Sequence, residues 1–136
     1  MKKILIVDDD PKTLEVLKLK LESTGLYEVI TESKGSLAVE VARKYQPDLV
    51  LLDILMPDML GSDVAAALHA DSELKHIKVV YITALLRQDD AQHSGSDIII
   101  GKPVSTAELI SVVEQVLGQG YVYPQFVFND AAIASE

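Results

Sequence analysis

Four runs of apolar residues without any internal polar residue constrain the fold of this chain most strongly. They are Ile4–Val7, Leu49–Leu52, Val79–Ile82 and Ile98–Ile100. A strand with one face in water alternates apolar and polar residues, whereas a strand that is covered on both faces does not. Each run is also too short for a buried helix. The pattern therefore predicts strands of a parallel sheet that lies between two layers of helices.

Helical patterns separate these runs. Asp10 and Pro11 are typical of a helix start, because Asp is a favoured N-cap and Pro suits the first helical position. Leu14, Leu17 and Leu21 then recur at helical spacing. We expect further helices over Gly35–Tyr45, Ser62–Ala70, Arg87–Gln92 (short and weak) and Ser105–Gly118, and one more strand over Glu28–Thr31.

Five strand–helix units within residues 1–118 predict an α/β fold. Right-handed crossovers and helices on both faces favour an open, doubly wound, five-stranded parallel sheet. We expect the flavodoxin-like strand order 2-1-3-4-5. We expect residues 1–118 to form this domain and residues 119–136 to be a C-terminal aromatic-containing tail or linker remnant.

The composition excludes several classes of function. The net charge is −9 and the sequence pI is about 4.7, so the surface would repel nucleic acid and anionic membrane. The chain has no cysteine, which excludes disulfides and thiolate metal sites. It has no apolar stretch of membrane-spanning length and no signal-peptide pattern at its start. We therefore expect a cytoplasmic protein.

Aspartates follow two of the apolar runs. Asp10 suits a helix N-cap, but the same role does not explain Asp8 and Asp9, because one residue suffices for the cap. Asp53 ends the run that corresponds to the third strand. Ligands of such sheets bind at the carboxyl ends of the strands, where the strand order reverses. Three carboxylates converging there favour a bound cation, and oxygen ligands suit Mg²⁺ in an open, partly hydrated site.

Residues that suit phosphate chemistry follow the remaining two runs. Thr83 offers a hydroxyl after the fourth strand, and Lys102 offers an ammonium group after the fifth. With Mg²⁺, these groups would neutralise the oxygens of a transferring phosphoryl group, and Asp53 would attack phosphorus as the nucleophile. A lone Thr or Lys at such a position is usually a turn or surface residue. Together, these residues at matching strand ends indicate a site.

These residues and their motifs resemble the receiver domain of two-component response regulators over about residues 2–118. The matching segments are IVDDD, LVLLDILMPDMLG, YITA and GKP. The resemblance implies a phosphoprotein in a phosphorelay: Asp53 would accept a phosphoryl group from a histidine kinase or a phosphotransfer protein. The output would be altered contacts with a downstream protein partner, without direct nucleic-acid binding.

The resemblance also assigns individual roles. Asp8, Asp9, Asp53 and the backbone carbonyl of Leu55 would hold Mg²⁺. Thr83 and Lys102, with Asp53, would form the catalytic group that contacts the phosphoryl oxygens. Apart from the resemblance, Asp58 and Ser62 are expected to cap or shape the loop after Asp53.

The sequence departs from the family pattern in three places. Ile99 stands where the family usually has Tyr or Phe. Lys102 follows Thr83 by 19 positions, a shorter spacing than the family's. This spacing predicts that the fourth helix along the chain, expected over Arg87–Gln92, is short or distorted. Leu55 and Leu85 occupy positions that tune hydrolysis of the acyl phosphate in relatives. Because apolar side chains do not orient water, we expect a long-lived phosphoryl state.

Two other functions compete with this reading. A degenerate receiver would bind proteins without ever taking up phosphate. Ile99 and the shortened fourth helix keep this alternative open, whereas the intact acidic pair, Asp53, Thr83 and Lys102 argue against it. A small phosphatase resembling the haloacid dehalogenases would be a true enzyme. However, Thr13 is one position too late for that family's motif, and Asp89 and Asp90 precede Lys102 instead of following it. We expect no enzyme with a separate substrate, only self-phosphorylation and self-dephosphorylation.

The tail carries four of the chain's aromatic residues, Tyr121, Tyr123, Phe126 and Phe128. We expect them to pack within the chain or across a homodimer, with a linker remnant as the alternative. The three histidines show no metal-ligand spacing and are expected at the surface; they are His69, His76 and His93.

Overall fold

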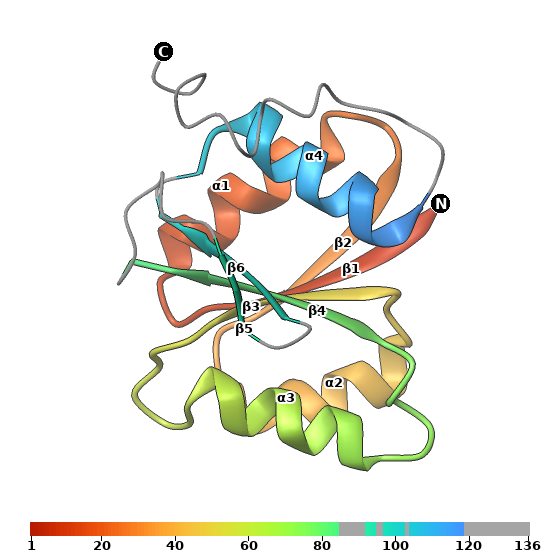
Figure 1. Cartoon of the computed structure of the whole chain (residues 1–136), viewed down its shortest axis with the longest axis vertical. Coiled ribbons are helices and arrows are strands. Elements are labelled where there is room, and N and C mark those ends of the chain that lie inside the picture. Colours follow the sequence, from red (N-terminus) through yellow and green to blue (C-terminus); the bar gives the residue numbers. More distant parts are fainter. Residues whose placement is uncertain (85–91, 95–96, 103, 119–136) are drawn as a thin grey trace.

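The computed structural model describes residues 1–84, 92–94, 97–102 and 104–118. A twisted sheet lies between two pairs of helices, with α1 and α4 on one face and α2 and α3 on the other (Figure 1). The strands are β1 (Lys2–Val7), β2 (Tyr27–Glu32), β3 (Leu49–Asp53), β4 (Lys78–Thr83), β5 (Gln92–Ser94) and β6 (Asp97–Gly101). The helices are α1 (Pro11–Glu22), α2 (Ala38–Tyr45), α3 (Gly61–Ala70) and α4 (Thr106–Leu117), and the 3-10 turn η1 (Gly35–Leu37) precedes α2.

The strand order is β2-β1-β3-β4-β6-β5, and β1, β2, β3, β4 and β6 pair in parallel. The predicted five-stranded parallel order 2-1-3-4-5 is therefore confirmed, with β6 as the fifth predicted strand. The strand order reverses between β1 and β3, which are neighbours in the sheet. The carboxyl ends of these two strands thus meet where ligands bind in sheets of this class.

A short strand that the sequence pattern did not predict extends the sheet. The three-residue strand β5 pairs antiparallel with β6, with His93 opposite Ile98. The segment QHS has no apolar run that would predict a strand, and backbone pairing with β6 places it in the sheet. The helix expected over Arg87–Gln92 lies outside the described residues except for Gln92, which is in β5 and not in a helix.

Burial explains why the strands lack polar alternation. In β1, Ile4 and Ile6 belong to the core beneath α1 and α4, whereas Leu5 and Val7 belong to the core beneath α2 and α3. All four side chains are buried, and so is every residue of β3. Helices cover both faces of the sheet, so an apolar residue is favoured at every position of these strands.

The start of α1 forms as the sequence predicts. The Asp10 carboxylate accepts the backbone N–H of Lys12 at 3.2 Å and the Thr13 hydroxyl at 2.8 Å, and Pro11 is the first helical residue. The Thr13 hydroxyl, followed by the Lys12 N–H, holds the pKa of Asp10 below its usual value. Asp10 is thus engaged in the cap, while Asp8 and Asp9 lie before the helix.

Candidate functional site

Three carboxylates converge at the carboxyl end of the sheet. Asp8 follows β1, and Asp53 is the last residue of β3. Because Val7 is paired with Leu52 in register, the residues that follow them lie side by side. Asp8, Asp9 and Asp53 each offer one oxygen, and these oxygens lie within 4.8 Å of one another. Asp8 and Asp53 are buried, and Asp9 is exposed. The predicted carboxylate cluster is therefore formed.

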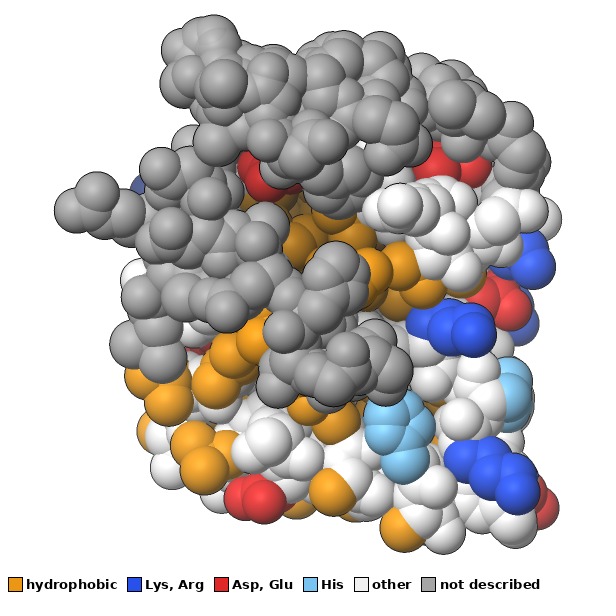
Figure 2. All heavy atoms as spheres, viewed as in Figure 1, with side chains coloured by type: hydrophobic (Ala, Val, Ile, Leu, Met, Phe, Trp, Pro, Cys, Tyr) orange, Lys and Arg blue, Asp and Glu red, His pale blue; other side chains and the backbone are white. Residues whose placement is uncertain are grey.

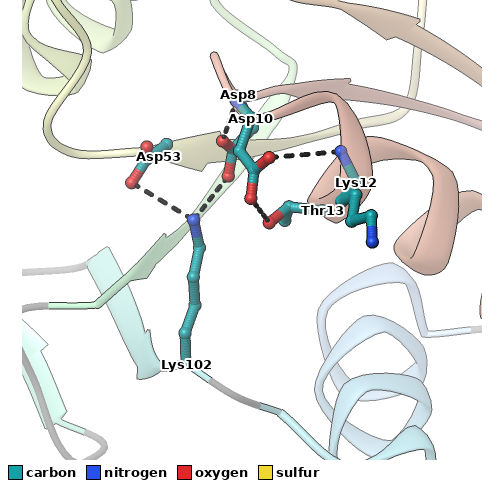
Figure 3. A network of polar contacts seen from close by, with 6 residues as sticks. All are labelled: Asp8, Asp10, Lys12, Thr13, Asp53 and Lys102. Atoms are coloured by element: carbon teal, nitrogen blue, oxygen red, sulfur yellow. Dashed lines mark hydrogen bonds and ion pairs between the residues drawn. The ribbon is translucent and has the colours of Figure 1, made fainter.

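Asp8 links this cluster to the start of α1 and to Lys102. One of its oxygens, Oδ1, accepts the backbone N–H of Asp10 at 2.8 Å. The other, Oδ2, lies 2.6 Å from the Lys102 ammonium nitrogen, which is also 3.8 Å from Asp53 Oδ1. Figure 3 shows the lysine reaching up between the two carboxylates. The geometry brings one cation to two of the three predicted acidic ligands.

The environment of Asp53 disfavours its ionised form. Burial raises the pKa of Asp53 to about 6, and the negative charge of Asp8 contributes in the same direction. Lys102 lowers the pKa of Asp53, but does not cancel these effects. Asp9 raises it further. Such a carboxylate gains from an additional cation, since positive charge relieves both the desolvation and the repulsion.

Thr83 and Lys102 reach the same edge through neighbouring strands. Thr83 is the last residue of β4 and is buried, at 1% exposure. It is paired in register with Gly101 at the end of β6, and the backbone N–H of Lys102 donates to the Thr83 carbonyl at 2.8 Å. Thr83, at the end of β4, and Lys102, directly after β6, are thus brought to the edge that carries the carboxylates.

The loop between β3 and α3, residues 54–60, borders the cluster. Leu55 lies two positions after Asp53, and its side chain is 50% exposed. The N–H of Gly61, the first residue of α3, donates to the Ile54 carbonyl at 2.8 Å. A Cβ at Gly61 would lie 2.3 Å from the carbonyl oxygen of Asp53. Gly61 ends the segment LVLLDILMPDMLG that carries the family resemblance, but its close approach to the Asp53 backbone emerges only from the folded chain.

Other candidates from the sequence lie away from the cluster or outside the described residues. His69 and His76 are exposed, as predicted, and line a pocket with Lys75 and Lys78 near the amino end of β4. Figure 2 shows histidine side chains (pale blue) near basic side chains (blue) on one face of the molecule. The side chain of His93 is outside the described set. Leu85, Pro103 and the tail 119–136 also lie outside the described residues, so the predictions made for them stay predictions.

The donor set of the cluster fits a hard divalent cation. All three side chains offer carboxylate oxygens, one from an exposed residue, and no softer ligand is part of the cluster. Oxygen donors and an accessible position suit Mg²⁺, which keeps several of its waters when bound. None of the helices within the described ranges is long and apolar enough to cross a membrane.

Comparisons with known proteins assign this chain to a protein family. Residues 4–114 match the family model described as the response regulator receiver domain. The polar-differentiation response regulator DivK of Brucella anthropi is 33% identical over 120 residues, which cover 86% of this chain and 97% of that protein.

Solved structures agree with this match. The N-terminal domain of a response regulator receiver protein from Methanoculleus marisnigri is 35% identical, with a TM-score of 0.66 and coverage of 88% of this chain and 98% of that one. The receiver domain of the Pseudomonas aeruginosa sensor histidine kinase PA1611 is 26% identical, with a TM-score of 0.73 and coverage of 87% and 98%. That structure contains a magnesium ion coordinated in its active site cleft. With the family model matching most of its length, the chain belongs to the response regulator receiver domain family.

Proposed function

We propose that this chain accepts a phosphoryl group on Asp53 from a phosphohistidine of a histidine kinase or phosphotransfer protein, and that phosphorylation changes its contacts with a downstream protein. The observation that carries the proposal is the meeting of Asp53 with the Asp8 and Asp9 carboxylates and the Lys102 ammonium group at one sheet edge. Membership of the receiver family supports the phosphoacceptor role in particular.

In the proposed step, a carboxylate oxygen of Asp53 attacks the phosphorus of the donor. A new O–P bond forms while the P–N bond to the donor imidazole breaks, and the imidazole leaves with the electron pair and takes up a proton from solvent. Lys102, within 3.8 Å of Asp53, offsets negative charge on the phosphoryl oxygens. Thr83, at the end of the neighbouring strand, would donate its hydroxyl to one of those oxygens.

Asp8, Asp9, Asp53 and the Leu55 carbonyl would hold Mg²⁺ in this proposal. When bound, the cation would neutralise charge on the phosphoryl group and draw the three carboxylates together. The raised pKa of Asp53 supports a site that favours added positive charge. The magnesium ion in the PA1611 receiver domain supports the same assignment by similarity.

The surface beside Lys102 suits an anionic donor. A pocket of about 430 Å³ on the α1 side is lined by Lys12, Lys20 and Lys102 together with apolar residues of α1 and β4. The Lys20 ammonium group donates to the Val104 carbonyl at 2.8 Å, and that of Lys102 is paired with Asp8. The positive charge of these lysines would favour the approach of a phosphorylated partner to this side of the site.

The proposed chemistry is that of a switch and not of an enzyme with a separate substrate. The chain would catalyse only its own phosphorylation and dephosphorylation. A phosphoryl group at Asp53 would recruit Thr83 through a charge-assisted hydrogen bond, and the connection after β4 would follow. A receiver that binds partners without phosphorylation is the alternative that the experiment must exclude.

Intact-mass spectrometry after incubation with acetyl phosphate and Mg²⁺ tests the proposal. We expect the mass to rise by one phosphoryl group, about 80 Da. The gain should be lost in Asp53→Asn and in EDTA, and kept in Asp63→Asn, which removes an exposed carboxylate in the first turn of α3. A folded chain that gains no mass would support the phosphorylation-independent receiver. Turnover of p-nitrophenyl phosphate that needs Asp8 but survives Asp53→Asn would indicate a phosphatase.

A further inference from the structure

Two connections that are far apart in the sequence are joined beside the carboxylate cluster by one side chain. Asp58, in the loop after β3, accepts two backbone N–H groups from the connection between β2 and α2. Its Oδ1 lies 3.3 Å from the N of Gly35, and its Oδ2 lies 3.0 Å from the N of Ser36. Both N–H groups are at the start of η1, where no preceding turn supplies an acceptor. Asp58, in the loop of residues 54–60, therefore supplies the hydrogen-bond acceptors for both N–H groups.

Apolar packing also brings the loop of residues 54–60 close to η1. A Cβ at Gly35 would lie 3.0 Å from Met56 Cε and 3.2 Å from Met59 Cβ. Gly35 is buried, and Met56 is buried at 6% exposure. The absence of a side chain at Gly35 thus lets the loop after Asp53 approach η1 closely enough for the Asp58 carboxylate to reach both N–H groups.

The carboxylate of Asp58 is suited to hold this contact at neutral pH. The Ser36 N–H is the main cause that keeps the pKa of Asp58 below its usual value, and the Gly35 N–H acts in the same direction. An ionised carboxylate that accepts two N–H groups forms stronger bonds than a neutral acceptor would.

The Leu55 backbone depends on such outside contacts for its position. Leu55 is 50% exposed, so its own packing fixes its position less firmly than that of a buried residue. One end of the loop is fixed by the bond from Gly61 N to the Ile54 carbonyl at 2.8 Å. The other fixed points are the buried Met56 and the two bonds of Asp58. Leu55 lies between these anchors.

We propose that Asp58 is a positioning residue that sets the affinity of the site for Mg²⁺, by holding the Leu55 carbonyl in place through Gly35 and Ser36. This inference rests on the proposed function, since it assumes that Leu55 supplies a ligand. It assigns to the connection between β2 and α2 a role in metal binding, although that connection provides no ligand itself. Groups that orient metal ligands commonly influence affinity by an order of magnitude.

Calorimetric titration of Mg²⁺ into the full chain tests the role of Asp58. Asp58→Ala should weaken binding about tenfold, as for other groups that orient ligands. The matched control is Asp71→Ala, since Asp71 also carries one negative charge and accepts a backbone N–H, that of Glu73, at 2.8 Å within its own connection. Asp71 follows α3 and contacts neither loop 54–60 nor the connection between β2 and α2, so this control should change the affinity less than about twofold.

Two further variants separate geometry from charge and from stability. Asp58→Asn loses the charge but keeps one acceptor oxygen, so its affinity should lie between those of the wild type and Asp58→Ala. Gly35→Ala keeps the charge and places a Cβ against Met56 and Met59, so it should also weaken Mg²⁺ binding. Thermal unfolding in EDTA is measured for each variant. A purely structural role would lower the melting temperature and leave the Mg²⁺ affinity of the folded chain unchanged.

The outcomes distinguish this inference from the function on which it rests. Wild-type affinity in Asp58→Ala and Gly35→Ala, or an equal loss in Asp71→Ala, would overturn the role of Asp58 and leave the metal site intact. A wild-type chain that binds no Mg²⁺ would overturn the metal site itself, and the role of Asp58 with it. If Asp58→Ala does not fold, Asp58→Asn and Gly35→Ala decide the question.

Discussion

The ammonium nitrogen of Lys102 lies 2.6 Å from Asp8 Oδ2 and 3.8 Å from Asp53 Oδ1. The lysine is thus a direct partner of Asp8 and a more distant neighbour of the proposed phosphoacceptor. Both carboxylates are buried, so neither is well solvated without a cation nearby. This relationship makes Lys102 the first residue to test.

Replacing Lys102 by Ala should slow phosphorylation of Asp53 by acetyl phosphate about a hundredfold, because one group that offsets charge in the transition state is lost. The rate is followed by intact-mass spectrometry. Lys75→Ala serves as the control, because Lys75 is exposed and lies at the opposite end of β4. Equal rates in Lys102→Ala and the wild type would contradict the role of Lys102.

The stability of the chain in EDTA should depend on pH through Asp53. Its folded pKa is about 6, above its ordinary value of 3.8. At a pH between these two pKa values, Asp53 is more often protonated in the folded state than in the unfolded state. The stability of the folded state therefore decreases as the pH rises from about 4 to 6. Asp53→Asn removes this penalty. Its melting temperature should exceed that of the wild type by a margin that is smallest near pH 4 and reaches a plateau above pH 6. A margin that is constant with pH would show that the pKa of Asp53 is not raised.

Gly61→Ala should impair both stability and phosphorylation. The new Cβ would lie 2.3 Å from the Asp53 carbonyl oxygen, so the backbone that carries the phosphoacceptor must shift. Overpacking of this kind costs about 1–3 kcal/mol. Gly25→Ala is the comparison, since Gly25 has a φ of +76° but nothing within 4 Å of a Cβ. It should lower stability through backbone strain alone and leave the rate of phosphorylation unchanged. Phosphorylation rates that fall equally in both variants would argue against a local effect at Asp53.

The phosphoryl group on Asp53 should hydrolyse slowly. Leu55 is half exposed beside Asp53 and has no polar group that could orient an attacking water. Leu55→Asn supplies such a group and should shorten the lifetime several-fold. The lifetime is measured by mass spectrometry after removal of the donor. A wild-type half-life of only seconds in Mg²⁺ buffer would contradict this prediction.

The sequence by itself determined the five parallel strands, the helices that cover them and the residues of the carboxylate cluster. Uninterrupted apolar runs such as Leu49–Leu52 require cover on both faces, because an exposed face would favour polar residues at alternate positions. The same local reasoning assigned Asp10 to the helix cap, and the structure confirms it. These features depend on neighbouring residues in the chain, so they can be read from its local pattern.

Only the tertiary structure decided how distant residues meet. The strand β5 has no apolar pattern and forms by pairing with β6. Asp58 was expected to shape its own loop, yet its partners are the N–H groups of Gly35 and Ser36, more than 20 positions earlier. The approach of Gly61 to the Asp53 carbonyl likewise depends on the path of the loop between them. Such contacts are fixed by the packing of whole elements, and a local pattern carries no information on which distant backbone will supply the partner.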